Sequence, residues 1–146
     1  MALAWVLVAN QSHARLFEAD KRASALHELE SMIYPESRLK GRDIYADAPG
    51  RTFDRSGEGR HAMGNYRELR RRPARNRFAR ELAHALERGR EEGRYEKLYI
   101  VAEPQMVGSL RDALDSPTRA AIAGETSKNL VSSETDEIRA QLPHWL

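Results

Sequence analysis

An unbroken apolar run at residues 3–9 constrains the fold of this chain more than any other feature. The run reads Leu-Ala-Trp-Val-Leu-Val-Ala, without the alternation of apolar and polar residues expected of a strand that faces solvent on one side. It is too short to cross a bilayer, and it lacks the basic start and cleavage site of a secretion signal. We therefore expect a central strand, covered on both faces of its sheet.

Four more segments are expected to pair with this strand. Residues 14–20 and 26–33 follow it across short turn-like breaks, which predicts a three-stranded meander. Residues 98–102 form a second apolar run, and a last strand is expected within residues 122–131.

Helical spacing appears only after Pro73. The positions that carry the apolar stripe are Phe78, Leu82, Ala85 and Leu86. Gly89 and Gly93 are expected to end this helix. Ser116 is expected to cap a short helical turn, and Ser133 with Asp136 to form the capping box of a last helix, on which Ile138 and Leu142 face the core.

The order of these elements predicts one α/β domain over residues 1–146. Its centre is a single mixed sheet of about five strands with flanking helices, and 146 residues suit one hydrophobic core. Residues 35–74 show no period and are repeatedly interrupted by glycine and proline, so a long basic loop is expected there. Irregular connections of this length are uncommon unless they are functional or mobile.

Basic charge is concentrated in one part of the chain. The net charge is +2, but residues 51–94 contain 13 Arg, no Lys and 7 acidic residues, a local balance of +6 against −4 elsewhere. Such segregation indicates an anionic partner such as nucleic acid. The guanidinium group suits phosphate oxygens, and Phe53 and Tyr66 are candidates for stacking on bases, with packing of Phe53 against the core as the alternative. The predicted nucleic-acid-binding residues are Arg55, Arg60, His61, Arg70, Arg71, Arg72, Arg75, Arg77 and Arg80.

A simpler interpretation competes for the helical part of this segment. Arginines there can pair with Glu68, Glu81, Glu87 and Glu91 at helical spacings, as on any solvated helix face. This explains the helix better than it explains the preceding loop.

Metal and cofactor chemistry find little support in the residues. The chain has no cysteine, which excludes disulfides and thiolate ligands and fits a reducing compartment such as the cytoplasm. Glu81 and His84 have a Glu-x-x-His spacing, but a single such motif is expected to be a solvent-facing polar row. No cofactor, metal or membrane contact is expected.

Catalytic groups are also scarce. Asp54, Ser56 and His61 are the residue types of a hydrolase triad, yet no strand-turn-helix elbow presents the serine. The sequence Gly57-Glu58-Gly59 would let backbone amides approach a phosphate, but it describes a flexible tip equally well.

Three segments carry a resemblance to a known family. They are residues 6–17, the run Phe53-Asp54-Arg55-Ser56-Gly57-Glu58-Gly59-Arg60-His61-Ala62 and residues 101–111. Together they resemble the bacterial host attachment protein family over nearly the whole chain. That family is similar in turn to the central domain of eukaryotic-type peptide chain release factors, which implies a ribonuclease H-like sandwich and a role in translation.

The resemblance to release factors stops short of their catalytic motif. Arg77-Phe78-Ala79-Arg80 stands where those factors begin a helix after a Gly-Gly-Gln loop, but the glutamines here are Gln11, Gln105 and Gln141, none of them in the loop. The hydrolytic function is therefore not carried over. The preferred hypothesis is a noncatalytic domain that binds RNA, tRNA or the ribosome.

Two alternatives remain open. The first is a protein-interaction module that affects attachment to host cells indirectly, its basic face meeting an acidic protein or anionic polymer. The second is a hydrolase that uses the residues around His61.

Overall fold

Five strands form one mixed sheet in the order β3-β2-β1-β4-β5. The computed structural model describes residues 2–34 and 57–143, with side chains described in 2–34 and 73–143. The strands are β1 (Ala2–Ala9), β2 (His13–Ala19), β3 (His27–Ile33), β4 (Tyr95–Ala102) and β5 (Ile122–Ser127). The first three pair antiparallel, whereas β4 pairs parallel to both β1 and β5. The predicted mixed sheet is confirmed.

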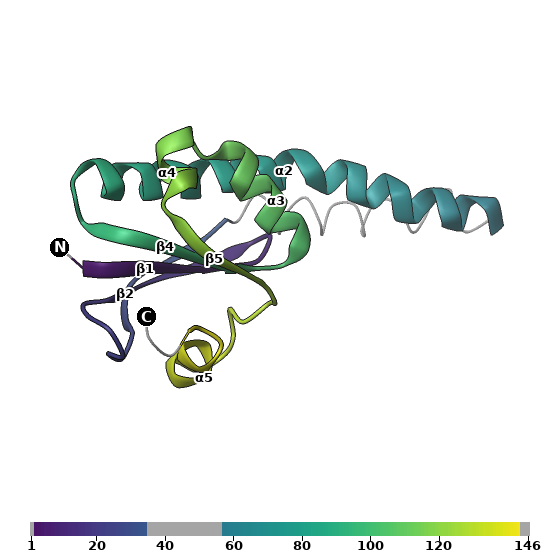
Figure 1. The fold of residues 1–146 in the computed structure, drawn as a ribbon. Helices are drawn as coiled ribbons and strands as arrows, with labels where there is room; N and C mark the ends of the chain where they lie inside the picture. The colour runs from purple at the N-terminus through teal and green to yellow at the C-terminus, as the bar shows by residue number, and fades with distance from the viewer. Residues whose placement is uncertain (1, 35–56, 144–146) are drawn as a thin grey trace.

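Helices cover both faces of the sheet (Figure 1). They are α2 (Gly57–Glu91), α3 (Pro104–Ala113), α4 (Ser116–Ala120) and α5 (Thr135–Ala140). The first three lie on one face, and α5 lies on the other. The predicted α/β sandwich is therefore confirmed at the level of its layers.

Strand β1 lies between two hydrophobic cores and contributes side chains to both. Trp5 and Leu7 lie in the core beneath α2 and α3, together with Phe78 and Leu82. Val6 and Val8, at the alternate positions, belong to the opposite core with Ile138. Successive side chains of a strand point to opposite faces, so a strand buried on both sides is apolar throughout. The prediction made from residues 3–9 is confirmed.

The prediction of a loop over residues 35–74 is wrong for residues 57–74, because α2 begins at Gly57 and continues through Pro73. Residues 35–56 lie outside the described part of the chain. The amino-terminal half of α2 extends past the end of the sheet (Figure 1), so the sheet imposes no apolar stripe on it. Its glycines and its proline lower helix propensity without forbidding a helix.

Two predicted caps are each displaced by one residue. Asp115, not Ser116, caps α4, and its carboxylate accepts a hydrogen bond from the backbone N–H of Thr118 at 2.9 Å. The capping box of α5 is formed by Glu134 and Glu137 in place of Ser133 and Asp136. Aspartate and serine are equally good caps, so composition alone does not choose between adjacent candidates.

The two glycines near the end of α2 have different roles. Gly93 follows the helix with φ +69°, a left-handed conformation that glycine adopts without strain. Gly89 lies inside the helix, where the ring of Trp5 occupies the space a Cβ would need. Trp5 in turn stacks on Tyr95 with ring centroids 4.7 Å apart. Only Gly93 therefore terminates the helix, and the prediction that Gly89 also ends it is wrong.

Candidate functional site

The amino-terminal half of α2 extends beyond the carboxyl edge of the parallel strands. The carboxyl-terminal half of the helix packs on the sheet, with Gly89 against Trp5 and Phe78 stacked on Tyr34 at the end of β3. The helix then continues past this edge (Figure 1), and its sixteen residues 57–72 alone are roughly 24 Å long at about 1.5 Å per residue. Most of the predicted nucleic-acid-binding residues fall on or next to this extension.

Arg75 fixes α2 where the helix leaves the sheet. Its side chain is only 6% exposed, and its Nε donates a hydrogen bond to Oγ of Ser109 in α3 at 3.2 Å. The Ser109 hydroxyl donates onward to Oδ1 of Asn76 at 3.0 Å. A buried guanidinium is stable only where its donors are satisfied, so this cluster specifies one position of α2 against α3.

Arg77 makes a second attachment at the same place. Its Nε donates to the Tyr34 hydroxyl at 3.3 Å, and the Tyr34 ring lies 5.1 Å from that of Phe78. The end of β3 is thereby tied to α2.

Arg80 is exposed and lies away from the buried stripe of α2. The predicted polar row of Glu81 and His84 is confirmed, because both side chains face solvent. His84 Nδ1 lies 3.7 Å from Oε1 of Glu87 on the same helix.

The remaining candidates are placed by backbone alone or not at all. Arg60, His61, Arg70, Arg71 and Arg72 are positions within α2, the same helix that carries Arg75, Arg77 and Arg80. Arg55 lies outside the described residues, as do Phe53, Asp54 and Ser56. The hypothesis of a triad containing His61 therefore stays a prediction.

Two kinds of feature are absent from the described residues. No group of three or more His, Asp or Glu side chains there is arranged to hold a metal ion. In the same part of the chain, no helix combines the length and apolar character needed to cross a membrane.

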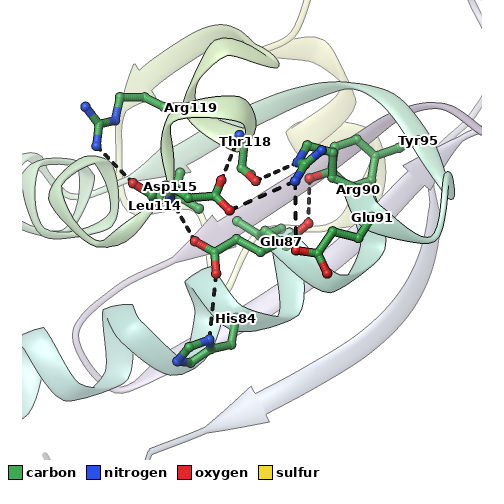
Figure 2. Close-up of polar contacts among 10 residues, drawn as sticks. His84, Glu87, Arg90, Glu91, Tyr95, Leu114, Asp115, Thr118 and Arg119 are labelled. Carbon is green, nitrogen blue, oxygen red and sulfur yellow. Dashed lines mark hydrogen bonds and ion pairs between the residues drawn. The ribbon is translucent and has the colours of Figure 1, made fainter.

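A polar network that the sequence did not reveal holds the other end of α2 (Figure 2). Glu87 accepts a hydrogen bond at 2.8 Å from the backbone N–H of Asp115, the residue that caps α4. Arg90 donates from Nε to Oγ1 of the buried Thr118 at 2.9 Å, and its NH2 lies 4.0 Å from the Asp115 carboxylate. The only signal in the sequence was the Asp-Ser-Pro start of α4.

Two pKa values reflect how tightly this network is built. Hydrogen bonds from Thr118 hold the pKa of Asp115 below its usual range. Burial raises the pKa of Tyr95 to about 12, and its hydroxyl donates to the backbone oxygen of Leu86 at 2.7 Å. These contacts join α2 to α4 and to β4, and they leave α2 held at two points along its packed half.

These features define an α/β protein in which a long arginine-rich helix, held at both ends of its packed half, extends past a five-stranded mixed sheet. The model of a protein family described as "Protein required for attachment to host cells" matches residues 5–142, and the chain belongs to that family. No curated protein matches the chain.

Proposed function

We propose that this member of the host attachment family is a noncatalytic RNA-binding domain that acts on tRNA or at the ribosome. The observation that carries the proposal is the course of α2, one continuous helix that takes the most basic part of the chain past the end of the sheet. Phosphate contacts supply most of the affinity in protein–nucleic acid complexes.

The predicted contact residues have two roles in this proposal. Arg80 and the arginines at positions 60, 70, 71 and 72 bind phosphate oxygens. Arg75 and Arg77, which already bond to Ser109 and Tyr34, hold the helix in position. A helix fixed in this way loses little conformational freedom on binding, and this preorganisation favours affinity.

The sequence resemblance to release factors favours RNA as the partner, whereas the absence of their catalytic motif argues against hydrolysis. The Gly-Gly-Gln motif of those factors is missing, so binding without peptidyl-tRNA hydrolysis is the function that matches these residues. An effect on attachment to host cells then arises indirectly, through translation.

Pull-down of the full chain from bacterial lysate, with and without ribonuclease, tests the proposal. We expect tRNA or ribosomal RNA to be recovered, and any ribosomal proteins to be lost after nuclease treatment. Protein partners that survive the nuclease, with no RNA recovered, would instead establish the protein-interaction alternative. Filter binding with purified tRNA at low salt gives the direct measurement, and no detectable affinity there would refute the proposal.

A further inference from the structure

The face of the sheet opposite α2 is covered largely by one short segment, residues 130–143, which we call the strap. It contains α5, a helix of only six residues (Figure 1). Val131, Ile138 and Leu142 of the strap are buried against apolar side chains of β1, β2 and β4, and Leu26 from the turn after β2 adds to the cover. One of the two cores therefore depends on a few side chains of a short segment.

Side chains, not backbone pairing, hold the strap to the sheet. Within the described part of the chain, the backbone–backbone hydrogen bonds of the strap all join its own residues to each other. Two arginines make the links to β2 and to the turn that follows it. Arg15 donates from NH1 to the backbone oxygens of Val131 and Ser133 at 3.0 and 2.7 Å. Arg139 donates from Nε to the backbone oxygen of Ser24 at 3.0 Å. Release of the strap therefore leaves every described strand pair intact.

The core under the strap also contains a polar group that favours release. Tyr99 belongs to this core together with Ile138 and Leu142, and it is only 2% exposed. Its hydroxyl has no hydrogen-bond partner among the described residues. Burial of a hydroxyl without a partner costs free energy, and access to water removes that cost.

We propose that the strap opens as a unit while the five-stranded sheet and the core beneath α2 stay folded. Proteins open locally in cooperative segments whose free energies lie below that of global unfolding. Helices α2, α3 and α4 each lie between two strands of the sheet, whereas α5 follows the last described strand, so it can leave without displacing one. Opening exposes an apolar face of β1, β2 and β4, the kind of surface through which proteins interact.

Thiol labelling tests the proposal, because the chain has no cysteine of its own. Val6→Cys places a thiol in the core under the strap, and Ala9→Cys places one on the same strand in the core beneath α2. Both positions are 0% exposed. After correction for the free energy of unfolding of each variant in urea, we expect Val6→Cys to react with a disulfide reagent at least about tenfold faster. Equal corrected rates would overturn the proposal.

Replacement of a linking arginine provides the second measurement. We expect Arg139→Met to speed labelling in the Val6→Cys background about fivefold, through loss of the bond to Ser24, and to leave the Ala9→Cys background unchanged. Arg119→Met is the matched control, since Arg119 donates to the backbone oxygen of Leu114 at 2.9 Å, away from the strap. It should leave the rate of Val6→Cys unchanged. An equal acceleration by Arg139→Met in both backgrounds would show that only global unfolding occurs.

Discussion

The Nε of Arg75 donates a hydrogen bond to Oγ of Ser109 across 3.2 Å, joining α2 to α3 where α2 leaves the sheet. The bond is shielded from solvent because the Arg75 side chain is almost fully buried. It links the packed half of the helix, which belongs to the hydrophobic core, to the extended half, which carries the proposed function.

Removing the serine hydroxyl should weaken the fold at this junction. We expect Ser109→Ala to lower the free energy of unfolding by about 1–2 kcal/mol, because a buried guanidinium loses an acceptor. Urea denaturation provides the measurement, and Ser127→Ala, at an exposed serine, should change stability by less than about 0.5 kcal/mol. Equal effects of the two substitutions would show that the Arg75–Ser109 hydrogen bond does not stabilise the fold.

Two glycines within helices should respond in opposite directions to alanine. Gly89→Ala places a methyl group into the ring of Trp5 and should cost about 1–3 kcal/mol. Gly108→Ala, in α3, meets no atom within 4 Å and should stabilise the protein by about 0.5–1 kcal/mol. Thermal unfolding of the pair compares them, and a stable Gly89→Ala variant would contradict the close packing of α2 on β1.

Two buried tyrosines form a similar matched pair. The Tyr95 hydroxyl donates to Leu86, so Tyr95→Phe should cost about 1 kcal/mol. The Tyr99 hydroxyl is buried without a partner among the described residues, so Tyr99→Phe should be neutral or stabilising by up to about 1 kcal/mol. A larger loss for Tyr99→Phe than for Tyr95→Phe in urea unfolding would contradict these assignments.

Alkaline pH should report on Tyr95 separately. Its pKa is raised to about 12, so the stability it contributes is complete below the unfolded pKa near 10 and is lost as the pH rises toward 12. Tyr95→Phe should remove that part of the alkaline loss. If the variant and the unmodified chain lost stability identically at alkaline pH, the raised pKa of Tyr95 would be contradicted.

The Arg15–Glu28 pair should make stability depend on acidic pH. The hydrogen bond from Arg15 holds the pKa of Glu28 below its usual range, so its contribution is present above pH about 4.3 and is lost as the pH falls through the lowered pKa. We expect Glu28→Gln to lower the free energy of unfolding by up to about 1 kcal/mol at pH 7, and this difference to disappear once the pH has fallen below the lowered pKa of Glu28. A pH-independent difference between the variant and the unmodified chain would contradict the ion pair.

Removal of the Arg15 side chain should lower the free energy of unfolding more than removal of the charge on Glu28. Arg15 also donates to the backbone oxygens of Val131 and Ser133, at 3.0 and 2.7 Å, and so ties β2 to the segment that leads into α5. Its loss leaves these partly buried backbone oxygens without their donor, in addition to breaking the ion pair.

The apolar residues predicted the sheet and its layers well. The run at residues 3–9 and the strand at 98–102 were identified because a strand buried on both faces has no polar positions. The phase of Phe78, Leu82 and Leu86 identified the packed half of α2 for the same reason, since all three are buried against the sheet.

The extended half of α2 had no such signal. Periodicity reports burial, and this half extends past the sheet, so its glycines and Pro73 predicted a loop where a helix forms. The double role of the arginines was equally hidden. Arg75 and Arg80 look alike in sequence, and only the packing of α3 shows that one is buried beside Ser109 and the other is exposed.

The salt dependence of tRNA binding tests the central claim most directly. We compare the unmodified chain with Arg70→Ala/Arg71→Ala/Arg72→Ala and with Lys21→Ala/Arg22→Ala/Arg88→Ala, a control that removes three exposed basic side chains away from the extension. The first variant should bind at least about tenfold more weakly, with a log Kd against log salt slope reduced by about 2–3, because each lost phosphate contact releases about one counterion fewer. The control should retain both affinity and slope. Equal losses in the two variants, or no affinity of the unmodified chain for tRNA at low salt, would contradict the account.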